Sequence, residues 1–253
     1  MSESHYARIA SLYDRFVKTD YDVPFFINET KKAGSSVLEL MAGTGRLTIP
    51  LLEAGVQVTA VDFSAEMLAV LRTKLSQKGL NAAIHQMDIR ALDLGEQFEQ
   101  IILPFQAFPE ITDIEDQQQT LRGIYKHLKP GGEFICTLHN PTARLKFVDN
   151  QLQLAARQEQ DNGGNLLVWL LQKYDPITRL VEVLEFFEEY DSDGLMAAKR
   201  YSALQFHLLE RDTFIKLVDE TGFEVARVYG DYNYAPFVDD SSPFMIWVLR
   251  RTA

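Results

Sequence analysis

The 253-residue chain is 46% hydrophobic and 24% charged, a composition typical of a globular protein large enough to bury a substantial core. Its formal net charge of −11 opposes binding to the phosphate backbone of a nucleic acid. Apolar runs such as NLLVWLL are far shorter than the roughly 18 residues of a membrane span, and the single cysteine, Cys136, cannot form an intrachain disulfide. We therefore expect a cytoplasmic protein with no nucleic-acid or membrane partner.

The first half of the chain alternates short apolar runs with helical segments. The helix expected at 64–79 has a serine N-cap, Ser64, and stops at Gly79. Because strands separated by helices form βαβ units, we expect a parallel sheet with right-handed crossovers. The predicted strands lie at 37–40, 56–62, 82–87, 98–105 and 133–139, and the other predicted helices at 44–54 and 115–128.

The pattern changes after residue 141 to long strand-like runs joined by turn signals. Asp175-Pro176 and the run DSDG at 191–194 separate these runs, and no helix intervenes, so we expect an antiparallel meander. A helix at 211–221 and strands at 222–229 and 244–251 are predicted to complete the chain.

The stretch SSVLELMAGTGRLTIPLLEAG, residues 35–55, begins as a strand and ends as a helix, with Gly43 and Gly45 at the join. Such a joint usually holds a nucleotide or a nucleoside. A dinucleotide site requires a third glycine near the position of Thr48, and a Gly-Lys-Ser/Thr phosphate loop is absent as well. The two glycines alone leave the ligand open.

Acidic residues at the ends of neighbouring strands narrow the choice. Asp62 ends the second predicted strand, where ligands of a doubly wound sheet bind, so it is placed to accept both hydroxyls of a ribose. Asp88 follows the third strand, where an adenine edge would lie, and Glu39 in the first strand could hold a ligand amine. We find no positive charge for a pyrophosphate. The pattern predicts a site for a ribose, an adenine and a zwitterionic amino-acid tail.

Several segments resemble the class I S-adenosylmethionine-dependent methyltransferases. LELMAGTG is similar to the first motif of that family, VDFSAEML to its acidic second motif and QMDIRALDL to its third. ILPFQAF and LKPGGEFICTLH resemble the fourth motif and the helix–turn–strand that follows it. Residues 6–16 resemble the lead-in helix of small-molecule members, and residues 223–251 the closing hairpin of a subgroup with an antiparallel lid sheet, which includes sugar-amine N-methyltransferases. Met41 departs from the pattern, because the family normally has glycine there.

This resemblance implies a fold, a domain division and a reaction. The expected fold class is α/β, a doubly wound, mostly parallel, seven-stranded Rossmann-like sheet with a late antiparallel β insertion. Residues 1–141 and 209–253 would form the S-adenosylmethionine-binding domain, and residues 142–208 an inserted lid or substrate subdomain. The expected enzyme transfers a methyl group from S-adenosylmethionine to an amine or hydroxyl of a small molecule and releases S-adenosylhomocysteine. The alternatives are a non-catalytic S-adenosylmethionine-binding protein and an NAD-type Rossmann oxidoreductase.

The resemblance also implies which residues contact the cofactor. The glycine loop would bring its backbone close to the amino-acid moiety, Asp62 would bind the ribose and Tyr13 the carboxylate. The full expected set is Tyr13, Glu39, Ala42, Gly43, Gly45 and Asp62, with Phe63 and Met67 on the faces of the adenine, Asp88 and Ile89 at its edge, and Leu103 beneath the ligand.

Methyl transfer is an in-line displacement that requires alignment of donor and acceptor, and a base only where the nucleophile must lose a proton. His139, at the end of the fifth predicted strand, and His207, late in the meander, are the candidate bases. No spacing of His, Asp and Glu indicates a metal site, so we expect no metal.

The acceptor is expected to be a small molecule in a partly closed cavity built by the elements added to the sheet. Tyr6, Tyr232 and Tyr234 are the expected substrate contacts, since their apolar faces with hydroxyl tips suit small-molecule pockets. The acidic balance favours a neutral or cationic acceptor such as an amine. The alternative use of the meander is a homodimer interface.

Overall fold

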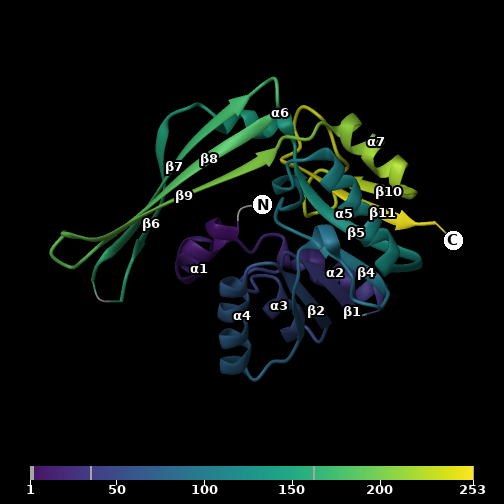
Figure 1. Cartoon of the computed structure of the whole chain (residues 1–253), viewed down its shortest axis with the longest axis horizontal. Coiled ribbons are helices and arrows are strands. Elements are labelled where there is room, and N and C mark those ends of the chain that lie inside the picture. The colour runs from purple at the N-terminus through teal and green to yellow at the C-terminus, as the bar shows by residue number, and fades with distance from the viewer. Residues whose placement is uncertain (1–2, 35, 162, 253) are drawn as a thin grey trace.

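The computed structural model describes residues 3–34, 36–161 and 163–252, whose strands form two separate sheets (Figure 1). The larger sheet has seven strands in the order β10-β11-β5-β4-β1-β2-β3. The pairs among β1 to β5 are parallel, while β11 is antiparallel to both β5 and β10. The predicted fold class is confirmed. The strand bounds are β1 Ser36–Leu40, β2 Gln57–Asp62, β3 Ala83–Gln86, β4 Phe98–Leu103, β5 Leu128–His139, β10 Phe223–Tyr229 and β11 Phe244–Arg251.

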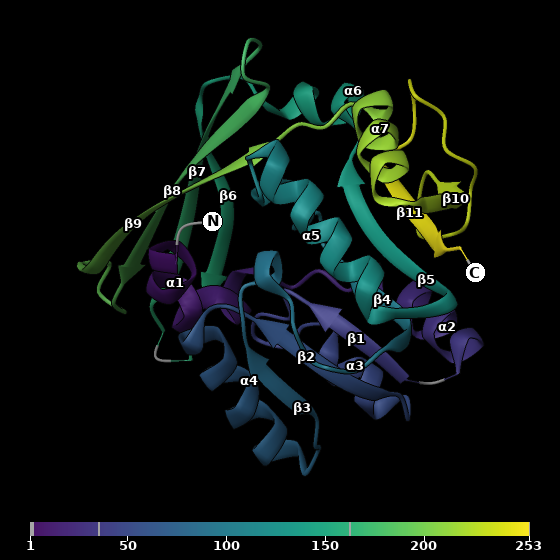
Figure 2. The same ribbon diagram turned by 45° about the vertical axis from the view of Figure 1, so that its right-hand side comes forward.

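Helices cover both faces of this sheet because its strands are apolar on both sides. Neighbouring residues of β4 point to opposite faces, so Ile101 packs in one core cluster and Ile102 in the other. One face carries α2 (Val23–Ala33), α3 (Thr48–Glu53) and α4 (Ala65–Lys78), and the other carries α5 (Ile114–His127) and α7 (Arg211–Thr221) (Figure 2). In the described part of the chain, no helix is long and apolar enough to cross a lipid bilayer.

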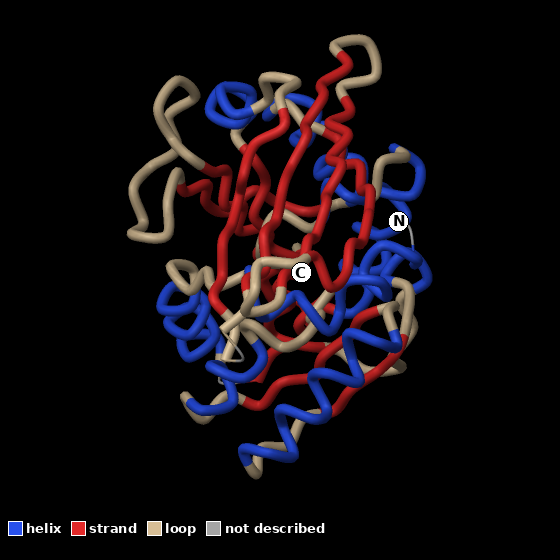
Figure 3. Tube along the Cα trace, turned by 90° about the vertical axis from the view of Figure 1, so that its left-hand side faces the viewer, coloured by secondary structure: helices blue, strands red, loops and turns tan. Residues whose placement is uncertain are grey.

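The second sheet is an antiparallel meander that extends away from the first, and we call it the lid sheet (Figures 1 and 3). Helix α1 (Glu3–Phe16) packs against its inner face, where Ile9 and Leu12 meet Leu166, Val168 and Phe187. Helix α1 also contacts α4, so it lies between the lid sheet and the larger sheet. The lid strands are β6 Leu152–Glu159, β7 Asn165–Asp175, β8 Leu180–Tyr190 and β9 Met196–His207, and the short helix α6 Pro141–Arg144 precedes them.

The structure shortens two predicted elements at positions where the backbone turns left-handed. The helix predicted from residue 44 begins at Thr48, because Gly43 and Gly45 have φ of +57° and +83° and cannot belong to a right-handed helix. The strand predicted to end at residue 105 ends at Leu103, and φ is +59° at Phe105. Both turns lie at the carboxyl edge of the parallel strands, where they shape the wall of a cavity.

Candidate functional site

A cavity of about 580 Å³ opens at the carboxyl ends of β1, β2 and β4. Its walls come from α1, the loop after β1, the end of β2, the start of α4 and the loop after β4. The lining residues are Tyr6, Tyr13, Glu39, Met41, Ala42, Gly43, Thr44, Arg46, Leu47, Asp62, Phe63, Met67, Pro104, Phe105, Ala107 and Glu110.

The loop after β1 is held tightly against β2 and α4. The backbone N–H of Gly43 donates to Oδ2 of Asp62 over 2.8 Å. A Cβ atom at Gly45 would collide with Leu71 of α4, and its φ of +83° is also unfavourable for other residues. Gly45 therefore lets the loop pack closely against α4, and Gly43 lines the cavity beside Asp62. Thr48, where a dinucleotide site would have its third glycine, instead donates to Oε2 of Glu39 over 2.6 Å.

Asp62 ends β2 with its carboxylate on the cavity wall. Its Oδ1 accepts from the backbone N–H of Ser64 over 2.8 Å, and the residue is 6% exposed. Burial raises the pKa of Asp62, although these backbone hydrogen bonds act in the opposite direction. A fixed, poorly solvated carboxylate at this edge is suited to accept hydrogen bonds from a diol.

Glu39 and Arg46 bring opposite charges to the same cavity. Glu39 is almost completely buried, which raises its pKa to about 7. Arg46 lies over the ring of Phe105, 4.4 Å from its centre, and makes two hydrogen bonds of 2.6 Å to Asp22. The sequence-based expectation that no cation lines this site was wrong, because the side chain of Arg46 turns back from the glycine loop. Asp22 pairs with Arg46, and no second Lys or Arg is among the described residues that line the cavity.

Helix α1 closes one side of the cavity. Asp14 accepts from the hydroxyl of Thr44 over 2.7 Å and from Nζ of Lys74 over 2.8 Å, which fastens α1 to the glycine loop and to α4. Tyr13 and Tyr6 of the same helix line the cavity. The helix thus contributes both a wall and its attachment.

A tyrosine–carboxylate pair lies where α1 meets the loop after β4. The hydroxyl of Tyr6 donates to Oε1 of Glu110, at the end of the short helix η2 (Phe108–Glu110), over 2.5 Å. Burial is the main cause that raises the pKa of Glu110 to about 7, and the charge of Asp62 adds to it. A carboxyl group that ionises near neutrality can accept a proton at physiological pH.

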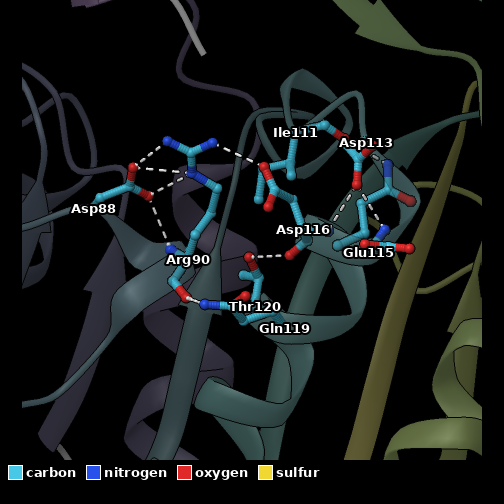
Figure 4. A network of polar contacts seen from close by, with 9 residues as sticks. Asp88, Arg90, Ile111, Asp113, Glu115, Asp116, Gln119 and Thr120 are labelled. Atoms are coloured by element: carbon cyan, nitrogen blue, oxygen red, sulfur yellow. Dashed lines mark hydrogen bonds and ion pairs between the residues drawn. The ribbon is translucent and has the colours of Figure 1, made fainter.

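Four of the residues expected at the cofactor do not line this cavity: Gly45, Asp88, Ile89 and Leu103. Leu103 and Ile89 are buried in the core under the sheet edge. Asp88 lies beside the cavity in a polar network, where its carboxylate accepts from the guanidinium and the backbone N–H of Arg90 (Figure 4). Arg90 also binds Asp116 of α5 over 2.8 Å. Burial alone would raise the pKa of Asp88, but its hydrogen bonds with Arg90 lower it.

The two candidate histidine bases lie outside the cavity. His139 stacks on Phe206 with ring centres 4.9 Å apart, and burial lowers its pKa to about 3. His207 at the end of β9 is half-buried, which also lowers its pKa. Neither is among the residues that line the 580 Å³ space, and their catalytic role stays a prediction.

The expected substrate tyrosines separate into two places. Tyr6 lines the cavity, whereas Tyr232 and Tyr234 pack with Phe25 of α2. The hydroxyl of Tyr232 donates to Thr137 over 3.1 Å, and that of Tyr234 to Glu29 over 3.0 Å. The loop that carries both tyrosines follows β10, which runs parallel to β5. However, β10 is the edge strand of the sheet, beyond β11, so this loop folds over α2 and not over the cavity.

Sequence reasoning missed Arg46 and Phe105, which lie in turns, and Glu110, which ends the short helix η2. The available signal was their position directly after β1 and β4, the two central strands whose carboxyl ends face a ligand in this topology. In the described part of the chain, no three His, Cys, Asp or Glu side chains are grouped as metal ligands.

The family model that this chain matches and two of its relatives are all methyltransferases. Residues 37–132 match the family model described as a methyltransferase domain. The glycine/sarcosine N-methyltransferase of Halorhodospira halochloris is 29% identical over 252 residues, which cover 94% of this chain and 83% of that protein. The enzyme of the same name from Aphanothece halophytica is 29% identical over 237 residues, covering 90% of this chain and 80% of that protein.

Solved structures share the whole fold. The CcbJ methyltransferase from Streptomyces caelestis has a TM-score of 0.82 at 21% identity, and each chain is covered completely. The sugar N-methyltransferase KedS8 from Streptoalloteichus sp has a TM-score of 0.77 at 16% identity, covering 96% of this chain and 92% of that one. At these identities the structures establish the fold.

Proposed function

We propose that this chain, which the comparisons identify as an S-adenosylmethionine-dependent methyltransferase, methylates the amino nitrogen of a small molecule. One observation carries the choice of an amine: the carboxyl group of Glu110 lines the cavity, accepts a hydrogen bond from Tyr6 over 2.5 Å and can pair with a cationic acceptor, and its pKa is raised to about 7. An ammonium acceptor must lose a proton before it can attack, and Glu110 supplies a base that is ionised near neutral pH.

The cofactor is S-adenosylmethionine, which supplies an activated methyl group on its sulfonium sulfur. The residues of this cavity fit the molecule, since the buried carboxylate of Asp62 ends β2 at its wall and the loop after β1 turns beside it with positive φ at Gly43. We assign Asp62 to the ribose hydroxyls and Glu39 to the amino group. Arg46 lies in the same wall as the candidate partner of the carboxylate, together with Tyr13. Phe63 and Met67 remain the proposed contacts of the adenine.

In the reaction, the residues of the chain remove a proton from the acceptor, orient the base and exclude water. Glu110 takes a proton from the acceptor ammonium, and the freed nitrogen lone pair forms a bond to the methyl carbon as the carbon–sulfur bond breaks. Tyr6 donates to the Glu110 carboxylate and fixes its direction. The tyrosines of α1 also exclude water from this end of the cavity. Most of the rate enhancement would come from alignment, because effective molarities reach roughly 10⁵–10⁸ M.

Glu110→Gln tests this proposal because it keeps the shape of the side chain and removes the base. We expect kcat with an amine acceptor to fall by about 10²- to 10⁴-fold, while calorimetry shows unchanged binding of S-adenosylhomocysteine. In the wild-type protein kcat should rise with pH through an inflection near the pKa of about 7, which the variant lacks. Glu224→Gln, at an exposed position of β10, is the matched control. Full turnover by Glu110→Gln between pH 6 and 9 would remove the base from the mechanism.

The homodimer through the inserted sheet remains a proposal of its own. A row of apolar side chains crosses the four lid strands, from Leu154 through Trp169 and Phe186 to Tyr201. Leu154 is 48% exposed and Tyr201 is 49% exposed, so this row offers a surface for a second copy of the chain. Sedimentation of the full chain as a monomer at all concentrations would exclude this dimer.

A further inference from the structure

A second cavity, of about 700 Å³, adjoins the cofactor cavity at the edge of the lid sheet. The two cavities have only Tyr6 and Glu110 in common among their lining residues. The tyrosine–carboxylate pair therefore separates the space assigned to the methyl donor from a space that remains for the acceptor. The residues that line this acceptor cavity are His5, Tyr6, Glu110, Thr112, Glu182, Ala203, Leu204 and Gln205.

The acceptor cavity contains acidic groups and no basic partner for them. Glu182 of β8 lies between Lys173 of β7 and Gln205 of β9 in the sheet register. Its side chain makes no ion pair or hydrogen bond with a described residue, and the exposed Lys173 does not line the cavity. No Lys or Arg is among the described residues that line the cavity. His5 is neutral at physiological pH, since burial and the charge of Arg8 lower its pKa to about 4.

A further carboxyl group, that of Glu185, lies next to His5 and outside the lining of the acceptor cavity. Glu185 is 8% exposed, its Oε2 has no hydrogen-bond partner, and it lies 3.6 Å from Nε2 of His5. Burial is the main cause that raises its pKa to about 7, and the neighbouring Glu110 adds to it. The charges of Glu110 and Glu185 thus oppose each other across the wall of this cavity. Their combined field favours cations and disfavours anions.

We propose that the acceptor is a basic amine that carries no acidic group, and that Glu182 of the lid sheet is the residue that selects it. The proposal rests on the proposed function, because it takes Glu110 as the point where the reacting nitrogen binds. An acceptor with a carboxylate would bring that charge beside Glu182, and no Lys or Arg among the described lining residues would pair it, which is costly in a partly enclosed site. A second ammonium or a hydroxyl at the same place finds an acceptor in Glu182, and Gln205 and Thr112 provide neutral polar contacts.

Three acceptors with the same four-carbon spacing separate the alternatives. They are 1,4-diaminobutane, 4-amino-1-butanol and 4-aminobutanoate, whose remote groups are positive, neutral and negative. We expect kcat/KM of the wild-type protein to fall in that order, with at least tenfold between the first and the last. Calorimetry on protein loaded with S-adenosylhomocysteine should give the same order of affinities, which makes the test independent of turnover.

Glu182→Lys should invert this selectivity. We expect the variant to lose at least tenfold in kcat/KM for the diamine, to gain at least tenfold for 4-aminobutanoate, and to change little for the amino alcohol. Glu224→Lys makes the same change of net charge far from the cavity and should keep the wild-type order. Thermal melting of both variants checks their folding, and Glu182→Gln, with an intermediate order, provides a variant of nearly unchanged shape.

The outcomes of these experiments separate the selectivity assigned to Glu182 from the proposed methylation of an amine. If S-adenosylhomocysteine binds but none of the three amines binds or is methylated, the proposed function and the inference both fall. If amines are methylated but 4-aminobutanoate is preferred, or if Glu182→Lys leaves the order unchanged, only the inference falls. Inversion by Glu182→Lys, with the wild-type order kept by Glu224→Lys, supports both.

Discussion

Asp62 shows how one side chain can serve the fold and the ligand together. Its two oxygens accept from the backbone of Gly43 and Ser64, so the carboxylate fixes the glycine loop relative to β2. Asp62 also lines the cavity, and each oxygen of its carboxylate has a further lone pair to offer a ligand. A residue arranged in this way should affect binding of the cofactor more than folding.

Asp62→Ala should therefore weaken binding of S-adenosylmethionine. The loss of charge-assisted hydrogen bonds worth roughly 1.5–3 kcal/mol corresponds to about 10- to 150-fold in the dissociation constant. Calorimetry measures it directly, with Asp93→Ala at an exposed position as the control. An unchanged dissociation constant for Asp62→Ala would take the residue out of the site.

At the scale of single residues, sequence reasoning found several of the side chains that line the cofactor cavity. Tyr13, Glu39, Asp62 and Met67 were expected at a ligand, and all of them line the cavity. Glu110 could not be found in this way, because its position depends on the left-handed turn after β4 and on contact with Tyr6, over a hundred residues earlier in the chain. A loop conformation set by such distant packing leaves no periodic pattern in the sequence.

Helix α1 is the element on which both cavities depend. It packs on the lid sheet through Ile9 and Leu12, and Asp14 ties its last turns to Thr44 and Lys74. The same helix presents Tyr6 to both cavities. Detachment of α1 would therefore open the cofactor site and misplace Tyr6 at the same time.

Asp14→Ala should loosen this attachment without unfolding the protein. The two contacts are partly exposed, so we expect a loss of about 1 kcal/mol, or roughly fivefold, in the affinity for S-adenosylhomocysteine. Hydrogen exchange of the backbone of residues 6–16 should become faster in the variant. Ser11→Ala, on the exposed side of the same helix, should change neither quantity. Equal exchange rates in Asp14→Ala and wild type would show that the contacts do not hold α1.

The elements themselves were predictable where their pattern was regular. The alternating helices and strands up to β5 follow from apolar periodicity. Strands β7 and β8 follow from long strand-like runs bounded by the turn signals at Asp175-Pro176 and at 191–194, and their burial alternates in the structure. Strand β6 was not distinguished in the sequence, because QLQLAARQE is mostly exposed and lacks an apolar face. Helix α2 was missed as well. Its stability comes from packing of Phe25 and Phe26 against the sheet and the aromatic loop after β10, which local sequence does not reveal.

The whole molecule concentrates carboxyl groups of raised pKa around its two cavities. Burial raises the pKa of Glu39, Glu110 and Glu185 to about 7 in each case. When the pKa of a carboxyl group is higher in the folded than in the unfolded protein, the folded state binds the proton more tightly. The protonated form of the group therefore favours folding. Its contribution to the free energy of unfolding is fully present below about pH 4.5 and is lost as pH rises through about 7.

Glu185→Gln should reveal this linkage, because the amide stays neutral at every pH. Relative to wild type, the variant should gain roughly 1–3 kcal/mol of unfolding free energy at pH 8 over its value at pH 5. The neighbouring His5 has a pKa lowered from 6.5 to about 4. Its contribution to the free energy of unfolding is therefore lost in the opposite direction, as pH falls from 6.5 through about 4. Urea unfolding at the two pH values measures the difference. A difference that does not change with pH would show that Glu185 is not buried as an acid.

A crystal structure of the protein with S-adenosylhomocysteine tests the central claim most directly. The account predicts the ribose hydroxyls on Asp62, the amino-acid tail between Glu39 and Arg46, and the sulfur directed toward the pair formed by Tyr6 and Glu110, with the acceptor cavity beyond it. A ligand bound elsewhere, or a sulfur directed away from Glu110, would contradict the assignment of the methyl-transfer site.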